Sequence, residues 1–562
     1  MKKLLIFMLC VVFALSFAAC GESGESGDGG DAAAEIQVAA PSGTYVGHDN
    51  DGVAEFLGIR YGEFEPFKPA KDVTTTTDDV IEASGFGFNC IQPYDEVEMA
   101  SQDPCSQDCL FLNIWTKDVE VVNKPVVMFI HGGSCIWGGT SDPTYDGEYF
   151  VRNLLEDEDC CFITINYRMS IFGGLDLSSL EGYTDEYYDA INMSKLDQTQ
   201  ALKWIHENIA AFGGDPENVT IMGQSAGGGA VEMLMADQDT HEYFKHAIIN
   251  SGTQSREAIS KEKVSSNSEK VFEILGVSSI DELTALTDDQ FSEKMQDIID
   301  ELGRAHPGLK CADGKIISES WWEDLENGAA KDIDLLIGGT NGEEDWNAVD
   351  WDNSVSEPLA EPDDILAYIE ETDTARDDTY GRFYPTKTAG FMDGYMAMGD
   401  DPVKQAMDLY NDAYFNYPTQ YIAEMQSKNN QNTYLYAWEY APDMEEVLEY
   451  SGDSAEVSPW GRALHCMDLC FEFGTKEGYT EMTGDPEKMS DEMIAQAREM
   501  VYNFAESGDP NNELLGAQWP QFNMDDKVSM VVNPDGTWST ESNHRQQAMD
   551  YMHKLTPYGV GE

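Results

Sequence analysis

Residues 219–229 read Val-Thr-Ile-Met-Gly-Gln-Ser-Ala-Gly-Gly-Gly, and residues 230–236 continue as Ala-Val-Glu-Met-Leu-Met-Ala. A β-branched apolar run, a Gly-x-Ser-x-Gly turn and a run of good helix formers follow one another here. This order is typical of a strand–turn–helix whose turn is too tight for bulky side chains and lifts the serine hydroxyl clear of the backbone. The bare Gly-x-Ser-x-Gly pattern arises by chance in about one of four chains of this length. The rest of the chain therefore decides what Ser225 does.

Further apolar runs predict a mostly parallel sheet around this turn. Residues 126–130 are an unbroken apolar run, as a strand covered on both faces requires. Similar runs occur at 161–167, 247–250, 335–339 and 434–438. Helical patterns such as residues 196–212 lie between these runs, so the chain is predicted to be an α/β protein. Two helix-prone blocks, 256–330 and 355–430, are expected to be insertions that cap the sheet.

Length and charge limit the classes of function. A chain of 562 residues exceeds the usual size of one simple core, which predicts one large domain with subdomains, or two domains. The formal net charge of −72 argues against nucleic acid or an anionic membrane surface as partner, because both would be repelled. We interpret the carboxylates mainly as a solvated surface that keeps the protein soluble.

The N-terminus resembles an export signal. Lys2 and Lys3 precede an apolar run over residues 4–19 that is too short to span a bilayer comfortably. Small residues then precede Cys20, and a polar Gly/Ser/Asp/Glu/Ala linker follows it. These features predict a lipoprotein-type signal over residues 1–19, lipidation of Cys20 and a cell-membrane lipoprotein facing outside. The alternative is an ordinary secretory signal and a secreted protein.

The domain boundaries follow from these features. Residues 20–40 are predicted to be a flexible acidic linker, and residues 41–562 the folded domain. In this arrangement the protein meets a membrane only through its lipid anchor.

A serine hydroxyl needs a base to remove its proton at neutral pH. In the order serine, acid, histidine, His465 follows Ser225 with room for an intervening strand and acid, and it lies in a loop-like stretch. The strand predicted at 335–339 leads into three adjacent carboxylates, residues 343–345, any of which has the right place in the chain for the acid. Spacing alone does not separate them.

The developing oxyanion needs N–H donors. The backbone of Ala226, the residue after the nucleophile, supplies one N–H donor. The turn His131-Gly132-Gly133-Ser134, which follows a buried strand, has the place in the chain expected for the other donors.

Several motifs in a fixed order identify a family. They are Gln-Asp-Cys-Leu-Phe-Leu-Asn-Ile-Trp at 107–115, His-Gly-Gly at 131–133, Ala-Phe-Gly-Gly-Asp-Pro-Glu-Asn-Val-Thr at 211–220, Gly-Gln-Ser-Ala-Gly-Gly at 223–228 and Gly-Asp-Pro-Asn at 508–511. From about residue 43 to about residue 522 the chain resembles the type-B carboxylesterases, the carboxylesterase and cholinesterase branch of the α/β-hydrolases. The resemblance implies an α/β-hydrolase fold: a central, mostly parallel sheet flanked by helices with helical cap insertions.

The resemblance also implies roles for individual residues. Ser225 matches the nucleophile and His465 the base. Glu344 matches the acid, since the family pattern Gly-Thr-Asn-x-x-Glu counts from Gly339 to Glu344. The oxyanion-hole positions are Gly133, Ser134 and Ala226. No metal or other cofactor is expected.

Two cysteines also match the family, whereas two other residues depart from its pattern. Cys90 and Cys109 match the family's N-terminal disulfide, with Cys105 as an alternative partner close in sequence. Asp345 stands where glycine is common. Gln224 stands where cholinesterases carry glutamate, which weakens the case for a choline ester substrate.

These features predict a serine carboxylic ester hydrolase that acts through an acyl-enzyme intermediate on a neutral carboxylic ester of unknown size. The acidic surface suggests that anionic esters are poorer substrates at low salt. Two rival functions remain: an adhesion or binding protein on the same scaffold, which the filled triad positions disfavour, and a lyase or amidase that uses the same residues. The oligomeric state is not indicated.

Overall fold

The computed structural model describes residues 34–555, apart from 94–103, 253–257, 304–307, 309, 346–366, 368–369, 371–389, 444–446, 448–457, 476–479 and 486–488. Residues 1–33, which include the predicted signal and Cys20, and residues 556–562 lie outside the described part. Within the described part, no helix is long and apolar enough to cross a bilayer. The account below concerns the compact unit from Glu35 onward.

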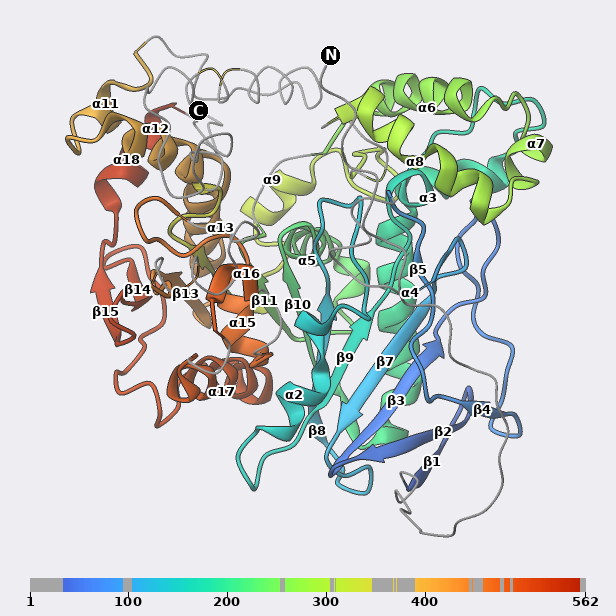
Figure 1. The fold of residues 1–562 in the computed structure, drawn as a ribbon, viewed down its shortest axis with the longest axis horizontal. Coiled ribbons are helices and arrows are strands. Elements are labelled where there is room, and N and C mark those ends of the chain that lie inside the picture. The colour runs from blue at the N-terminus through green and yellow to red at the C-terminus, as the bar shows by residue number, and fades with distance from the viewer. Residues whose placement is uncertain are drawn as a thin grey trace, which may run out of the picture. The chain divides into compact units, whose positions relative to one another are not determined.

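One large sheet runs through this unit, and its centre is parallel (Figure 1). In spatial order the parallel strands are β9 (Cys161–Ile165), β8 (Lys124–Ile130), β10 (Gly214–Gln224), β11 (His246–Asn250), β12 (Asp334–Thr340), β13 (Thr433–Trp438) and β14 (Val528–Val532). Antiparallel strands continue it on both sides: β1 (Glu35–Ala40), β2 (Gly43–Asn50), β3 (Val53–Arg60) and β7 (Phe111–Thr116) beside β9, and β15 (Trp538–Ser542) beside β14. The expected α/β-hydrolase fold is confirmed.

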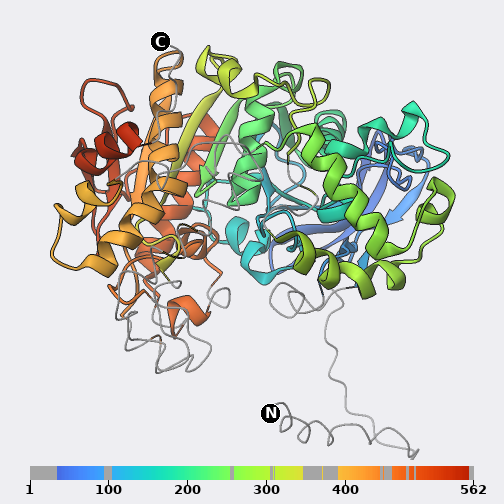
Figure 2. The same cartoon turned by 90° about the horizontal axis from the view of Figure 1, so that it is seen from above.

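Helices cover both faces of the sheet, as Figure 2 shows from above. Helices α4 (Met193–Asn208), α5 (Ala226–Ala236) and α13 (Tyr417–Ser427) contact its strands on one face, and α2 (Gly147–Arg152), α15 (Met467–Phe473) and α17 (Asp491–Ser507) cover the other.

Strand β8 shows why the sheet needs helices on both of its faces. All its residues are buried, with Val126 and Met128 in the core beneath α4 and α5, and Val127 and Phe129 in the core beneath α17. Successive side chains of a strand point to opposite faces, so an unbroken apolar run requires cover on both.

The remaining helices lie mainly at the two ends of the sheet. Figure 1 shows α6 (Lys261–Leu275), α7 (Ile280–Thr284) and α8 (Asp288–Leu302) together at one end, and α11 (Asp393–Met396), α12 (Pro402–Asn411) and α18 (Gln546–Leu555) at the other. Shorter elements are β4 (Val80–Glu82), β5 (Asn89–Cys90), β6 (Cys105–Ser106), α3 (Ser170–Gly173), α9 (Trp321–Glu326), α16 (Thr480–Thr483) and the π-helical turn η8 (Asp412–Asn416). The 3-10 turns are η1 (Pro143–Tyr145), η2 (Asp185–Asn192), η3 (Ile209–Phe212) and η4 (Gln238–Thr240).

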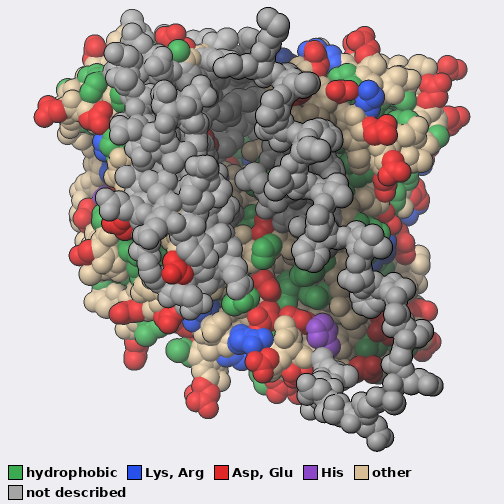
Figure 3. Space-filling model, viewed as in Figure 1, with side chains coloured by type: hydrophobic (Ala, Val, Ile, Leu, Met, Phe, Trp, Pro, Cys, Tyr) green, Lys and Arg blue, Asp and Glu red, His purple; other side chains and the backbone are tan. Residues whose placement is uncertain are grey.

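One boundary and two strands differ from the sequence prediction. Strand β1 begins at Glu35 and pairs with β2 along its whole length, so the folded domain starts before residue 41 and takes in the end of the predicted linker. The strands β14 and β15 were not predicted either. On the described part of the face seen in Figure 3, Asp and Glu side chains are scattered widely and few Lys and Arg side chains are visible.

Candidate active site

Ser225 lies at a sharp turn between the central strand β10 and helix α5. Its φ of 54° and ψ of −124° fall outside the usual regions for a residue with a side chain, and it is 8 % exposed. Its backbone N–H donates to the carbonyl of Asn250 at the end of the neighbouring strand β11, 3.0 Å away. Because such a conformation costs about 1–3 kcal/mol, the surrounding structure must hold it in place.

Close backbone packing supplies that support. A Cβ added at Gly223 would lie 2.3 Å from the carbonyl oxygen of Gly227, and one added at Gly227 would lie 2.0 Å from the carbonyl oxygen of Ile130. These distances leave no room for any side chain, since the obstructing atoms belong to the backbone. The glycines around Ser225 are therefore required by the contact between α5 and the ends of β10 and β8.

His465 forms a short contact with a carboxylate. Its Nδ1 lies 2.6 Å from Oε2 of Glu343, which is fully buried. The other oxygen of Glu343 accepts hydrogen bonds from the Ser251 hydroxyl at 2.7 Å and from the Thr340 N–H at 2.8 Å. These donors fix the orientation of the carboxylate toward the imidazole.

The prediction that Glu344 contacts the histidine is wrong by one residue. The Gly342 N–H donates to the Ala463 carbonyl and the His465 N–H donates to the Glu343 carbonyl, so residue 343 is the one beside the imidazole. The backbone N–H of Glu344 instead donates to Asn411 Oδ1 at 3.0 Å, and Glu344 is only half-buried. Counting along the family pattern missed this register, because contacts between the two loops set it.

The third carboxylate of the run holds the two loops together. Asp345 is fully buried and accepts from Arg462 through two atoms, Nε at 2.7 Å and Nη2 at 2.5 Å. The Ser458 hydroxyl and the Asn411 amide also donate to it. Arg462 lies three positions before His465, so this bidentate pair joins the loop of the acid to the loop of the base. The three adjacent carboxylates therefore have three different environments.

Gln224 is a further neighbour of the imidazole. Its Nε2 lies 3.0 Å from Nε2 of His465. Since Glu343 accepts the proton on Nδ1, Nε2 is the acceptor, and the amide of Gln224 donates to it. The fully buried Gln224 thus helps to select the tautomer in which Nε2 is free of a proton.

Charged neighbours set the protonation of His465. Burial opposes the imidazolium, but the adjacent Cys466 and the carboxylate of Glu343 raise the pKa of His465 well above its usual range. His131, by contrast, is neutral: burial lowers its pKa to about 4, and it has no carboxylate partner among the described residues.

The oxyanion-hole residues predicted from the sequence lie beside Ser225. Gly133 and Ser134 have φ values of 94° and 54°, in a turn where the N–H groups of residues 136 and 137 donate to the Gly133 carbonyl. Gly132 approaches so closely that an added Cβ would lie 3.0 Å from Cβ of Ser225. Within the described part of the chain, the N–H groups of Gly133, Ser134 and Ala226 donate to no protein acceptor, so they remain available for a bound oxygen.

The predicted disulfide is not formed in the structure. Cys90 and Cys109 are both free, buried thiols. Burial, together with the neighbouring Cys90, raises the pKa of Cys109, and the Met169 N–H donates to Cys90 Sγ at 3.3 Å. The two thiols are neighbours, but no covalent bond joins them. The backbone of Cys105 pairs with Asn89 rather than with Cys90.

A group of buried acids lies behind the site, and the sequence did not single it out. Asn250 donates its amide to both oxygens of Glu472, at 2.8 and 3.0 Å, and to the Tyr436 hydroxyl. Tyr436 in turn donates to Asp468 at 2.6 Å. Burial raises the pKa of Asp468 to about 6, and burial together with Asp468 raises that of Glu472 well above its usual range.

With the geometry established, comparison with known proteins identifies the family. A model of the carboxylesterase family matches residues 31–552. The chain belongs to this family. The para-nitrobenzyl esterase of Bacillus subtilis is 29 % identical over 536 residues, which cover 91 % of this chain and 98 % of the relative. The acetylcholinesterase of Electrophorus electricus is 26 % identical over 87 % of this chain and 82 % of its own.

Solved structures agree with this carboxylesterase assignment. A thermophilic para-nitrobenzyl esterase superposes with a TM-score of 0.74 at 25 % identity, over 92 % of this chain and 99 % of its own. A carboxylesterase of Geobacillus stearothermophilus gives a TM-score of 0.71 at 25 % identity over the same shares. The chain is therefore a carboxylic ester hydrolase, as the sequence predicted, and the adhesion alternative is not supported.

Proposed function

We propose that the chain hydrolyses small neutral carboxylic esters with Ser225 as nucleophile, His465 as general base and Glu343 as the acid that orients it. The observation that carries this proposal is the 2.6 Å contact between His465 Nδ1 and the fully buried Glu343, next to the turn that presents Ser225. Gly133, Ser134 and Ala226 are the proposed oxyanion donors.

The proposed reaction has two halves. In the first, Ser225 Oγ attacks the ester carbonyl while Nε2 of His465 takes the hydroxyl proton, and backbone N–H groups stabilise the oxyanion. The C–O bond to the alcohol then breaks, and the imidazolium returns its proton to the departing alcohol. In the second half, water attacks the acyl-enzyme with His465 again as base, and the acid leaves. Glu343 stays ionised throughout and stabilises the imidazolium.

Gln224 must release His465 for the first step to occur. In the free enzyme its amide occupies the lone pair that takes the serine proton. The approach of a substrate carbonyl to Ser225, the next residue in the chain, would supply an alternative acceptor for that amide.

A covalent active-site probe tests the proposal. A fluorophosphonate should add one label to the wild-type protein, and intact-protein mass analysis should find none on Ser225→Ala. Absence of labelling on the wild type, or equal labelling of the variant, would contradict the assignment of Ser225. Hydrolysis of 4-nitrophenyl butyrate, measured in parallel, reports the esterase activity itself.

The proposal includes export. A lipoprotein-type signal over residues 1–19 would leave Cys20 as the lipidated first residue and tether the enzyme to the outside of the cell membrane. Cys20→Ala should then move esterase activity from the membrane fraction to the soluble fraction. If the wild-type protein is already soluble and begins near residue 20 without a lipid, the protein is secreted and the anchor is wrong.

A further inference from the structure

A small cavity opens beside the proposed oxyanion hole. Helix α5 supplies its floor through Ala226, Ala230 and Met233, and Cys135 of the turn after β8 lies at its edge. Its free volume is about 30 Å³. A single water needs about 10–15 Å³, so this space suits a group of the size of a carboxylate.

One cation in this cavity, Lys310, has no counter-ion among the described residues. Lys310 is half-buried, and its ammonium forms no ion pair or hydrogen bond with any residue that the structure describes. Its backbone is fixed, because its carbonyl accepts from the Ile259 N–H at 2.8 Å and the next N–H, of Cys311, donates to Asn192 at 2.9 Å. A fixed backbone limits where the ammonium can go, although the side chain is long.

Helix α5 makes room for this ammonium at Gly229. A Cβ added there would lie 2.6 Å from Nζ of Lys310 and 3.4 Å from its Cε. The ammonium therefore lies against the first turn of α5, in the turn that follows Ser225. Burial raises the pKa of the Cys135 thiol, and the positive charge of Lys310 opposes that rise, which agrees with a charge close to the oxyanion turn.

A second polar group in the cavity has no hydrogen-bond partner within the described part of the chain. Gln198 of α4 is 3 % exposed, and within the described residues its side-chain amide forms no hydrogen bond. The amide is therefore available to donate a hydrogen bond to a group bound in the cavity. The other polar lining groups are engaged: Asn192 bonds Cys311 and Asp313, and Ser194 bonds the Arg168 carbonyl.

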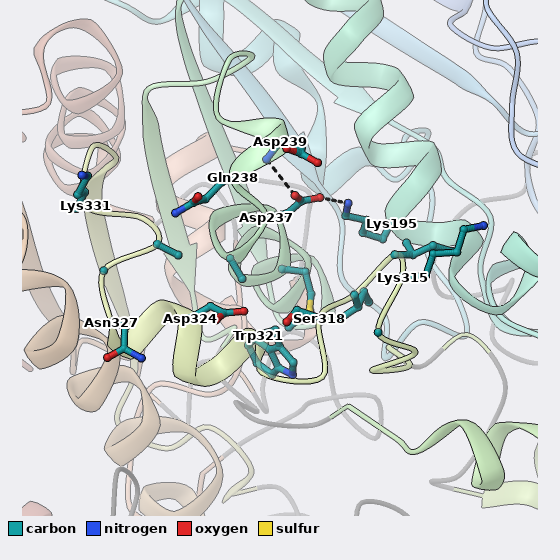
Figure 4. A pocket seen from close by; sticks show the side chains of 17 residues that line it. Lys195, Asp237, Gln238, Asp239, Lys315, Ser318, Trp321, Asp324, Asn327 and Lys331 are labelled. Carbon is teal, nitrogen blue, oxygen red and sulfur yellow. Dashed lines mark hydrogen bonds and ion pairs between the residues drawn. The ribbon is translucent and has the colours of Figure 1, made fainter. Parts of the chain in front are cut away.

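Two of the lysines that line a larger neighbouring cavity are paired with carboxylates (Figure 4). This larger cavity shares Lys195, Met233 and Ile317 with the small cavity. There, Lys195 points to Asp237 and pairs with it, as the dashed line in Figure 4 marks, and Lys315 pairs with Asp189. Carboxylates thus neutralise these two lysines, whereas Lys310 has no carboxylate partner among the residues that the structure describes.

We propose that the small cavity is a subsite for a carboxylate carried by the ester substrate, with Lys310 as the cation and Gln198 as the amide donor. An ammonium and an amide N–H together match a carboxylate, whose two oxygens accept hydrogen bonds. Long-range repulsion from the acidic surface slows the approach of such a substrate, and the local site stabilises it once bound. This inference rests on the proposed role of Ser225, and it extends the substrate class from neutral esters to monoesters of dicarboxylic acids or esters of carboxylated alcohols.

The experiment compares matched esters. In the acyl arm, 4-nitrophenyl hemiglutarate is compared with 4-nitrophenyl hexanoate; in the alcohol arm, 4-acetoxybenzoate is compared with methyl 4-acetoxybenzoate. For each pair the measured quantity is the ratio of kcat/KM, charged over neutral. Lys310→Met should lower this ratio by about 10- to 100-fold in one arm, because a hydrogen bond to a charged group is lost.

Two further variants keep the test decisive. Gly229→Ala places a methyl group where the ammonium lies and should lower the same ratio, while Lys310 itself is retained. Lys315→Met removes a lysine of the same segment that is already paired with Asp189, and should leave the ratio unchanged.

Each outcome has one meaning. A ratio that falls in either arm for Lys310→Met supports the subsite and tells which side of the ester occupies it. Unchanged ratios in both arms, or an equal fall for Lys315→Met, overturn it. If wild-type enzyme hydrolyses neither neutral ester, or Ser225→Ala retains that activity, the proposed mechanism has failed, and this result is distinct from failure of the subsite.

Discussion

The two halves of the proposed catalytic machinery are held by different forces. On the nucleophile side, backbone packs directly on backbone: Gly223 and Gly227 leave no space between β10, α5 and β8. On the acid–base side, buried polar groups join residues 343–345 to residues 462–465, through the Glu343–His465 contact and the Arg462–Asp345 pair. The first arrangement tolerates almost no change of residue, whereas the second depends on charges and hydrogen bonds that can be altered one at a time.

The largest effect is expected on the backbone-packed side. Gly227→Ala places a Cβ 2.0 Å from the Ile130 carbonyl oxygen, which cannot move without shifting β8. We expect loss of the soluble, cooperatively unfolding protein, measured by yield and by thermal melting followed with circular dichroism. A variant that melts like the wild type would show that α5 can move away from the sheet, contrary to the packing described.

Next in size is the effect of the acid on turnover. Glu343→Gln should lower kcat by about 10³- to 10⁴-fold, since the imidazolium loses its carboxylate and the tautomer is no longer fixed. The matched control is Glu344→Gln, which should stay within about twofold of the wild type. If Glu344→Gln instead lost activity and Glu343→Gln kept it, Glu344 would be the acid, and the contact between Glu343 and His465 would not be the catalytic one.

Breaking the buried ion pair between Arg462 and Asp345 should mainly lower the free energy of unfolding. Arg462→Met leaves the carboxylate of Asp345 buried without its cation, and breaking such a pair by removing one partner typically costs about 3–5 kcal/mol. Chemical denaturation should report this loss. The double variant Arg462→Met/Asp345→Asn removes the stranded charge and should recover part of the loss; an additive or larger loss would mean that Asp345 and Arg462 act independently.

The smallest effect concerns pH. The base must be neutral to accept the serine proton, and the pKa of His465 is raised well above its usual range. The profile of kcat/KM should therefore rise with pH, with its midpoint above the ordinary histidine value of about 6.5. Cys466→Ala removes a neighbour that raises this pKa and should move the midpoint toward lower pH. An unchanged midpoint would exclude Cys466 as a cause of the shift.

The same contrast explains what could be predicted from sequence. Ser225 and its turn were identified because the constraint is local: the glycines that the packing requires are adjacent in the chain. His465 was found from chain order. The acid was placed one residue too far along, since its position depends on hydrogen bonds between residues 342–343 and 463–465, which lie far apart in sequence.

Other features could not be recognised from one chain. Asp345 was noticed as a departure from the family pattern, but its reason, Arg462, lies more than a hundred residues later and carries no local signal. The early start of the domain was missed because β1 contains polar residues and becomes a strand through pairing with β2. The predicted Cys90–Cys109 bond relied on resemblance alone, and the structure has two thiols in its place.

The buried acids behind the site couple folding to proton uptake. Asp468 and Glu472 have raised pKa values in the folded protein, while in an unfolded chain they would ionise at ordinary acidic values. The native state therefore binds more protons than the unfolded state across this window, so their contribution to stability is lost as the pH rises. Near neutral pH, unfolding should release protons to the buffer, and the apparent calorimetric enthalpy should depend on the buffer's heat of ionisation.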